Sequence, residues 1–337
     1  MKRTKTILVG TTAVAAAAGV ALAVLPAFAA DGKDSARQAA HGDGSSGVTV
    51  QTGAGAGASG KDAAFFVASL NGANEVPVQQ GPAVGDRDGA ALEFVKVQGD
   101  KVSVAVKFRG TGKPTALHIH QGAKGTNGGI KIDFTELLAK GSTKAKGWSG
   151  AVRGTVRVKD RAVLAAFTGD PNGFYANLHT AEFPGGAVRG QFHKVTSSIR
   201  FDKALGFQAS VVKGKQIYEC KKGADGTYSF QQRDVRAVLG GNISHSFVAP
   251  NSGTPQWIAP DHSAVTGAVI SRTPNGATNI PELDLKATQS GKKRGLFAHT
   301  QEILRLNTVG GVAPAGSCAK GTIAGVPYGA DYVFVQK

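Results

Sequence analysis

Short runs in which apolar and polar residues alternate constrain this chain most strongly, because their period decides its secondary structure. In residues 102–108, Val and Phe alternate with Ser, Ala and Lys, which is the period of a half-buried strand. Similar runs recur along the chain, separated by Gly or Asp turns at the spacing of a β-sandwich. The chain has 47 Gly and 41% hydrophobic residues, a composition that suits short strands around a buried core and excludes wholesale disorder. We therefore predict an all-β protein.

The alternating runs divide into two sets without a repeat that relates them. The first set covers residues 65–70, 91–97, 102–108, 152–158 and 162–167, and the second covers residues 216–219, 257–258, 264–270, 283–287, 303–306 and 332–335. One helical turn is expected near residues 134–138. A chain of 337 residues suits about two domains. We predict two different β domains, at residues 62–195 and 200–337, joined near residues 195–200.

The N-terminal residues predict export. Lys2, Arg3 and Lys5 precede an apolar run over residues 7–25, and Pro26-Ala27-Phe28-Ala29 ends it. This pattern predicts a signal peptide over residues 1–29 that is cleaved after Ala29, and therefore a secreted protein. The alternative is a retained membrane anchor, since an apolar run of this length can span a bilayer. The Gly-, Ala- and Ser-rich residues 30–61 are predicted to form a flexible linker.

The charge of the chain limits its partners. Lys and Arg number 39 against 23 Asp and Glu, a formal net charge of +16, and the excess is spread over both halves. An even spread argues against a nucleic-acid-binding tail, and no pattern of interleaved basic and aromatic residues accompanies it. We expect weak attraction to anionic cell-wall polymers or to the headgroups of a membrane surface.

Three separated motifs in the first domain carry a family resemblance. They are Leu70-Asn71-Gly72-Ala73-Asn74-Glu75-Val76-Pro77, His118-Ile119-His120-Gln121-Gly122 with Gly125-Thr126-Asn127-Gly128, and Tyr175-Ala176-Asn177-Leu178-His179-Thr180 continuing to Gln191. In this order they resemble the CHRD domain, named after chordin. The resemblance implies an extracellular Greek-key-like β-sandwich, proposed to be related to copper/zinc superoxide dismutase. In chordin, such domains belong to a protein that sequesters growth factors.

The histidines of these motifs are the candidate metal ligands. His118 and His120 are two residues apart on an expected strand, so their rings project from the same face. His179 lies in another apolar strand and joins them if the two strands are close. Three imidazoles with an open position suit Zn²⁺ or Cu²⁺. The alternative is that these rings hydrogen-bond backbone groups and fix the turns that follow them.

The resemblance to copper/zinc superoxide dismutase extends to two of these segments. The His118-x-His120 element is similar to its copper-binding strand, and Leu178-His179 is similar to its later His strand. That enzyme uses further His residues and an Asp, and no obvious equivalents lie between His120 and His179. Superoxide chemistry is therefore predicted only as a feature of the alternative function, a copper- or zinc-binding protein.

Other residues of the motifs have architectural interpretations. Glu75 or Arg189 is expected to make a charge-assisted pair. The alternative for Arg189 is a ligand contact that steers anions toward the imidazoles. His193, near the end of the domain, is expected to be exposed.

The two cysteines, Cys220 and Cys318, both fall in the second domain. After export, a lone pair of cysteines in one domain is most simply a disulfide. The alternative is a catalytic thiol, with His299 near it in space.

The second domain, residues 200–337, resembles a family of exported proteins of unknown function. The resemblance rests on these cysteines, on Pro255-Gln256-Trp257, on Thr308-Val309-Gly310-Gly311 and on residues 326–334. It implies no activity. Trp257 is either a carbohydrate contact at a surface or part of the core, and His245 and His262 are expected in loops.

Taken together, the sequence predicts an exported, non-enzymatic protein of two β domains that binds a ligand or a cell-envelope surface. The alternative is a protein that binds copper or zinc through His118, His120 and His179. No Gly-x-Ser-x-Gly, His-Glu-x-x-His or phosphate-loop motif is present, so we predict no catalytic residues.

Overall fold

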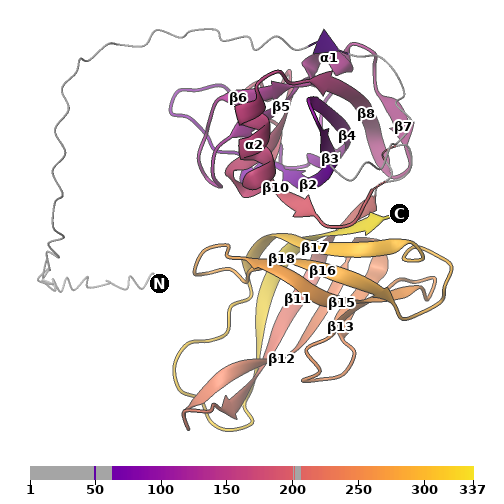
Figure 1. Ribbon diagram of the computed structural model, residues 1–337. Coiled ribbons are helices and arrows are strands. Elements are labelled where there is room, and N and C mark those ends of the chain that lie inside the picture. The colour runs from indigo at the N-terminus through magenta and orange to yellow at the C-terminus, as the bar shows by residue number, and fades with distance from the viewer. Residues whose placement is uncertain (1–48, 51–62, 200, 202–205) are drawn as a thin grey trace, which may run out of the picture. The chain divides into compact units, whose positions relative to one another are not determined.

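The structure is a computed structural model that describes residues 63–199, 201 and 206–337, together with the backbone of residues 49–50 (Figure 1). The predicted signal peptide and most of the predicted linker lie outside the described residues. No helix in the described ranges is long and apolar enough to cross a membrane. The described chain is almost entirely β-structure, which confirms the predicted all-β class.

The first domain is built from one antiparallel sheet that curls around its own core. Its strand order is β1-β8-β4-β3-β2-β10-β9-β5-β6, and β7 also pairs with β8. The strands are β1 (Thr49–Val50), β2 (Ala64–Asn71), β3 (Ala90–Gln98), β4 (Lys101–Arg109), β5 (Pro114–Gln121), β6 (Ile130–Asp133), β7 (Thr143–Ala145), β8 (Trp148–Arg157), β9 (Phe174–Thr180) and β10 (Val188–Val195).

Alternation along each strand decides which side chains enter that core. In β2, Phe66, Ala68 and Leu70 face the core with residues of the neighbouring strands, whereas Phe65 and Val67 face the opposite side. Strands β5 and β9 follow the same period. This alternation leaves the outer face of β5 and β9 free for polar side chains.

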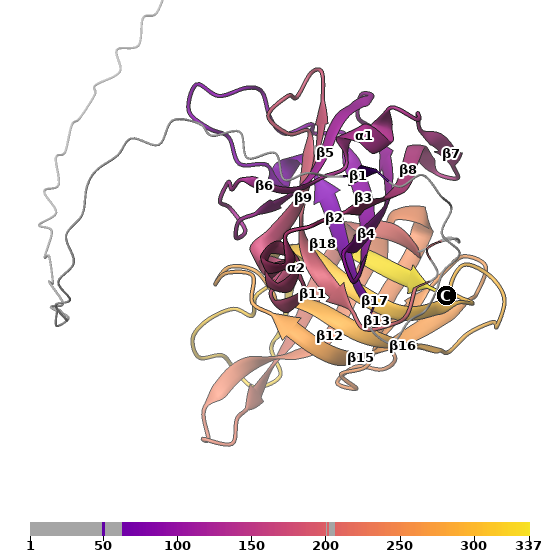
Figure 2. The ribbon, with the colours of Figure 1, turned by 45° about the horizontal axis from the view of Figure 1, so that its top comes forward.

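Residues 162–167, predicted as a strand, are helical instead. Helix α2 (Arg161–Gly169) begins after Asp160, whose carboxylate accepts hydrogen bonds from the backbone N–H groups of Ala162 and Val163. Helix α2 lies against the sheet (Figures 1 and 2). It buries Leu164 and Phe167, with the centre of the Phe167 ring 4.6 Å from that of Phe66. The N-cap and this one-sided burial override the strand-like composition. The turn expected near residues 134–138 is confirmed as α1 (Thr135–Leu138), and two 3-10 turns, η1 (Gly72–Asn74) and η2 (Pro171–Gly173), link other strands.

The second domain is a closed antiparallel barrel with the strands in chain order (Figure 1). They are β11 (Gly206–Lys222), β12 (Tyr228–Leu239), β13 (Ile243–Phe247), β14 (Pro255–Ile258), β15 (Ala264–Thr273), β16 (Glu282–Gln289), β17 (Thr300–Gly310) and β18 (Ile323–Gln336), and the 3-10 turn η3 (Gly240–Asn242) joins β12 to β13. Strands β12 and β13 were not expected. The N-terminal half of β12 is polar and exposed, because it forms the outer end of a hairpin with β11.

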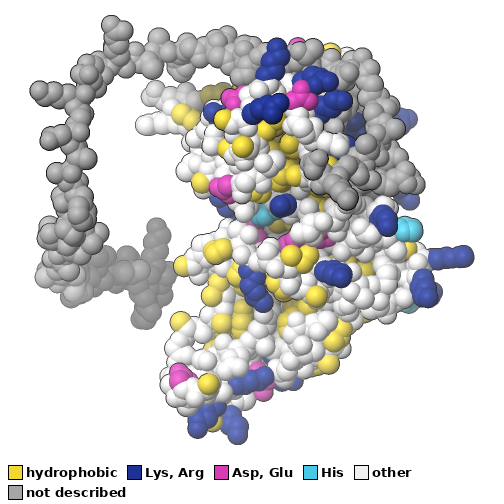
Figure 3. All heavy atoms as spheres, viewed as in Figure 1, with side chains coloured by type: hydrophobic (Ala, Val, Ile, Leu, Met, Phe, Trp, Pro, Cys, Tyr) yellow, Lys and Arg dark blue, Asp and Glu magenta, His cyan; other side chains and the backbone are white. Residues whose placement is uncertain are grey.

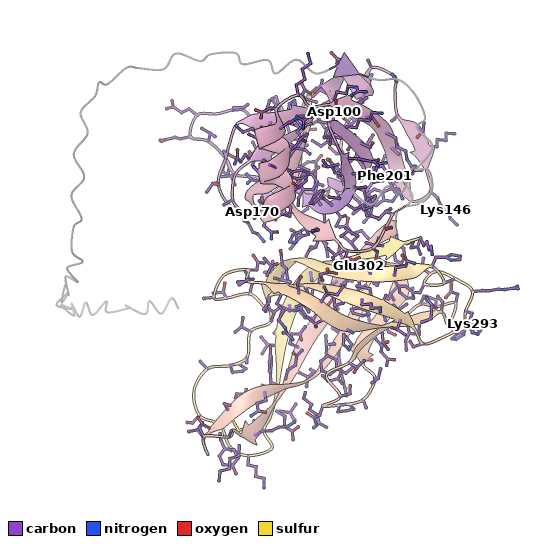
Figure 4. All side chains as sticks on the ribbon, viewed as in Figure 1. Asp100, Lys146, Asp170, Phe201, Lys293 and Glu302 are labelled. Carbon is purple, nitrogen blue, oxygen red and sulfur yellow. A yellow bond between two sulfur atoms is a disulfide. The ribbon has the colours of Figure 1, made fainter. Side chains whose placement is uncertain are left out.

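A third apolar cluster joins the outer face of the first sheet to the barrel. Val67 and Phe94 from the sheet pack in one cluster with Leu304 and Val333 from β17 and β18. On β17, the buried carboxylate of Glu302 accepts hydrogen bonds from the backbone N–H groups of Thr196 (2.9 Å) and Ser197 (2.7 Å) (Figure 4). Both domains therefore bury part of their surface against one another.

The expectation that His193 is exposed is wrong. Its ring is largely buried, and its Nε2 lies 3.2 Å from Oε2 of Glu282 on β16. Burial lowers the pKa of His193, and the carboxylate of Glu282 opposes that shift. Its position near the end of the first domain places it against the barrel instead of in solvent.

A disulfide links β11 to the connection between β17 and β18. Cys220 and Cys318 are bonded, which confirms the predicted pair and removes the catalytic-thiol alternative. The two cysteines are 98 residues apart in the sequence. The bond therefore closes a loop that contains most of the barrel.

Removing this disulfide should destabilise the barrel. In the chain-entropy model, a loop of this length contributes about 4–5 kcal/mol by restricting the unfolded chain. We expect the double variant Cys220→Ala/Cys318→Ala to lose a free energy of unfolding of that order, measured by urea denaturation. The reduced wild-type protein is the matched control and should lose a similar amount. An unchanged unfolding midpoint in both would contradict the prediction.

Candidate metal centre

The predicted ligands come from two neighbouring strands. Strand β5 pairs with β9 in an antiparallel register that sets His118 opposite Asn177 and Ala116 opposite His179. The intervening residues Leu117 and Leu178 point into the core. The imidazoles of His118, His120 and His179 therefore share the outer face of the sheet, as the spacing predicts.

The three rings converge closely enough to bind one ion. Nδ1 of His118 lies 3.2 Å from Nε2 of His179, and one nitrogen from each of the three rings lies within 4.8 Å of the other two. Two nitrogens bound tetrahedrally to one ion at ~2.0–2.1 Å are roughly 3.4 Å apart. The His118–His179 pair already has this separation, and His120 needs a small movement toward it.

In both His120 and His179, Nδ1 is hydrogen-bonded to a backbone carbonyl group. Nδ1 of His120 donates to the carbonyl oxygen of Gly128 at 2.9 Å, and Nδ1 of His179 donates to that of Pro184 at 3.0 Å. A carbonyl only accepts, so each neutral ring carries its proton on Nδ1 and presents the lone pair of Nε2. Nε2 of His120 is buried and has no hydrogen-bond partner among the described residues.

His118 is the ring whose tautomer can change. Because Nε2 of His179 must accept, Nδ1 of His118 donates to it, and Nε2 of His118 accepts from the hydroxyl of Thr135 at 3.2 Å. A metal bound through Nδ1 would displace this proton to Nε2. There the Thr135 hydroxyl and Oδ1 of Asp133, 3.5 Å away, could accept it. Each ring would then have an acceptor behind it, as in metal-bound histidines generally.

The environment keeps the three rings neutral. Burial lowers the pKa of His118 to about 4, outweighing the opposing charge of Asp133, while the nearby His179 and His120 add to the decrease. Burial also lowers the pKa values of His120 and His179. Protons would compete with a metal for these nitrogens. Because the pKa values are lowered, few protons bind to the rings at neutral pH, and this competition is weak.

Two family models match separate parts of the chain. A family model described as the CHRD domain matches residues 66–192. The chain contains a CHRD domain. A second model, described as a protein of unknown function (DUF3455), matches residues 240–336, within the barrel. No curated protein and no solved structure gives a significant match to the chain.

Arg189 fastens the loop that orients His120 in the CHRD domain. Its guanidinium donates to the carbonyl oxygen of Thr126 at 2.7 Å and to the side chain of Asn127 at 3.1 Å. It also lies 3.4 Å from the ring centre of Tyr175, and that ring stacks on His120 at 4.8 Å. Arg189 is 1% exposed. Its side chain therefore holds structure beside the imidazoles rather than offering its charge at the surface.

Gly128 allows this loop to approach the strand. A Cβ at this position would lie 1.6 Å from the carbonyl oxygen of Gln121, a separation that no side chain can occupy. Because the backbone comes this close, the carbonyl oxygen of Gly128 reaches His120. The Gly125-Thr126-Asn127-Gly128 segment thus supplies both the anchor for Arg189 and the acceptor for the ring.

Glu75 lies in the electrostatic field of Arg189 without a direct hydrogen bond to it among the described contacts. Burial raises the pKa of Glu75 to about 7, and the charge of Arg189 and a hydrogen bond from Asn177 oppose the rise. Oε1 of Glu75 has no partner in the described part of the chain. The expected charge-assisted hydrogen bonds of Arg189 go to the loop at residues 123–127 instead.

The other residues that the sequence singled out lie in the barrel. Trp257 is 1% exposed and stacks on His245 at 4.4 Å, so it faces the interior and not an outer carbohydrate surface. His245 was expected in a loop, but it lies on β13 with a buried ring. His262 is exposed in a turn, as expected, with a left-handed backbone (φ 66°).

Sequence reasoning missed the side chains behind the three imidazoles. Asp133 and Thr135 lie beside His118, and Tyr175 stacks on His120. The hydrogen bonds of His120 to Gly128 and of His179 to Pro184 are of the kind that the alternative interpretation predicted, although it did not name the two carbonyl groups. The one available signal was that each ligand strand runs directly into a Gly-rich segment, since such turns bring backbone carbonyls back toward a strand.

Arg189→Lys should loosen this arrangement. A lysine lacks the planar guanidinium that contacts Thr126, Asn127 and Tyr175 together, so we expect a loss of about 1–3 kcal/mol in the free energy of unfolding. Hydrogen exchange at the amide of Gly128 should accelerate as the loop opens. Arg87→Lys, at an exposed position, is the control and should change neither measurement. Equal behaviour of the two variants would contradict the assigned role.

Proposed function

We propose that the protein is a non-enzymatic extracellular protein whose CHRD domain binds Cu²⁺ or Zn²⁺ through His118, His120 and His179. The observation that supports this most directly is Nε2 of His120, which is buried and has no hydrogen-bond partner among the residues that the structure describes. A buried imidazole that only shaped a turn would gain from using both nitrogens, because an unsatisfied buried polar atom costs about 1–3 kcal/mol. A metal ion satisfies it.

The ligand set favours these two metals. All three ligands are neutral imidazoles, which suit Zn²⁺ and Cu²⁺ better than Ca²⁺ or Mg²⁺, whose ligands are oxygens. The carbonyl groups of Gly128 and Pro184 fix which nitrogen of His120 and of His179 faces the ion. Three protein ligands also leave a position for water or for a small external ligand.

The extracellular location is part of this proposal. The basic and apolar N-terminal residues fit a secretion signal. The disulfide between Cys220 and Cys318 supports it independently, because such bonds persist in oxidising compartments.

Attraction to anionic polymers of the cell envelope remains a secondary part of the proposal. The net charge of +16 supports it. On the face shown in Figure 3, Lys and Arg side chains lie at several separate places. Scattered charge of this kind supports weak attraction better than one specific docking site.

Metal content distinguishes this function from a purely structural role. Purified without a His tag and incubated with Zn²⁺ or Cu²⁺, the protein should hold one ion per chain by elemental analysis. We expect His120→Asn to weaken binding by more than about a hundredfold in calorimetry, because even residues behind the ligands contribute ten- to a hundredfold. The asparagine amide can keep the hydrogen bond to Gly128 while removing the ligand nitrogen.

His262→Asn is the matched control for this experiment. It makes the same substitution at an exposed imidazole whose left-handed backbone tolerates asparagine, and it should bind metal as the wild type does. A wild-type protein that takes up neither ion, or a His120→Asn variant with wild-type affinity, would refute the metal centre.

Asp133→Asn tests the acceptor behind His118. The metal-bound tautomer of His118 directs its Nε2 proton toward Asp133 and Thr135. The substitution removes the negative charge, and Thr135 still accepts, so we expect affinity for Zn²⁺ to fall by about tenfold. Asp88→Asn, at an exposed carboxylate outside the site, should leave affinity unchanged. A loss of equal size in both variants would show a general electrostatic effect instead.

A further inference from the structure

The barrel encloses a cavity that the metal centre does not involve. Its volume is about 80 Å³, and its walls include Gln216, His245, Trp257, Arg305 and Tyr332. It reaches solvent beside Val269 and Arg272, which are exposed cavity-lining residues. A space of this size accommodates several waters or the end group of a small molecule.

Two buried polar groups in the walls have no partner in the described part of the chain. They are the indole Nε1 of Trp257 and Nε2 of Gln216, and both residues are 1% exposed. The indole nitrogen can only donate. A buried donor without an acceptor is costly. We therefore expect Nε1 of Trp257 to donate to an acceptor from outside the chain.

The neighbouring polar groups are already engaged with one another. Nδ1 of His245 donates to the carbonyl oxygen of Gln256 at 2.9 Å, so its Nε2 accepts from the hydroxyl of Tyr332 at 3.1 Å. The hydroxyl of Tyr328 lies 3.3 Å from that of Tyr332 and donates to it. Burial lowers the pKa of His245 to about 3, so the ring is neutral and this chain of hydrogen bonds has one direction. None of these groups supplies an acceptor to Trp257.

The charge around the cavity is positive. Arg305 and Arg272 line it, and no Asp or Glu is among its lining residues. Arg305 is held by hydrogen bonds from Nε (3.2 Å) and Nη2 (2.7 Å) to the carbonyl oxygen of Pro281. A cavity with an unused donor, fixed positive charge and apolar walls such as Leu283 and Leu285 suits an anion with an apolar body.

We propose that the barrel binds a small carboxylate with an apolar tail. The carboxylate accepts from Nε1 of Trp257 and faces Arg305, and the tail extends along Leu283 and Leu285 toward the opening beside Arg272. This site is separate from the metal centre. The carboxylate site can therefore be tested independently of the proposed metal binding.

The indole N–H of Trp257 reports on this contact directly. The chain has two tryptophans, so the ¹⁵N-labelled mature protein gives two indole cross-peaks in NMR, and Trp148→Phe assigns them. The probes are benzoate, its neutral analogue benzyl alcohol and its cationic analogue benzylamine. We expect benzoate to shift the Trp257 peak and leave the Trp148 peak in place. The two analogues should bind at least about tenfold more weakly, because they lack the charge-assisted acceptor.

Substitution of the arginines completes the test. Arg305→Gln should weaken benzoate binding by about tenfold or more, whereas Arg294→Gln, at an exposed arginine outside the cavity, should not. If Arg305→Gln does not fold, as judged by thermal melting, Arg272→Gln at the opening replaces it, with the same expected direction. The proposal is overturned if benzoate leaves the Trp257 peak unmoved, if benzylamine shifts it as strongly, or if the folded arginine variant binds benzoate like the wild type.

Discussion

The antiparallel pairing of β5 with β9 is the constraint on which the proposed metal centre depends. Because the side chains of a strand alternate, the same register that sends Leu117 and Leu178 into the core sends His118 and His179 to the outer face. A slip of one residue would exchange the two sets, burying imidazoles in the core and exposing leucines. The packing of the first domain therefore enforces the geometry of its site, and ligand placement needs no separate source of stability.

Their position on the strands alone leaves the imidazole rings free to rotate. Hydrogen bonds to the loops fix the orientation of the rings. The carbonyl of Gly128 holds His120, and Arg189 holds the loop that carries this carbonyl. These rings are thereby ordered during folding, so an ion bound at the proposed site would meet nitrogens that are already directed. Burial contributes in the same sense, because it lowers the pKa values of the ligands and weakens competition from protons.

Sequence periodicity could predict which side chains share a face of one strand. It could not predict contacts between segments that are distant in the sequence. The shared face of His118 and His120 follows from spacing alone, whereas the approach of His179 requires the pairing of two strands. Residues 162–167 are apolar without a decisive period, so only the N-cap Asp160 marked a helix there. His193 was misjudged because the carboxylate that it contacts, Glu282, lies in the other domain.

Two buried histidines, one in each domain, differ in how their ring nitrogens are hydrogen-bonded. His245 in the barrel uses both nitrogens, donating to Gln256 and accepting from Tyr332, so it has no lone pair to offer and no cost to relieve. His120 is also buried and uses Nδ1 in the same way, but its Nε2 has no partner within the described ranges. The local sequence differs too, since His120 is separated from His118 only by Ile119, whereas His245 lies between Ser244 and Ser246. The hydrogen-bond inventory of each ring adds to this difference, because a buried acceptor that the described residues leave unsatisfied is costly, and an ion bound to Nε2 of His120 would relieve that cost.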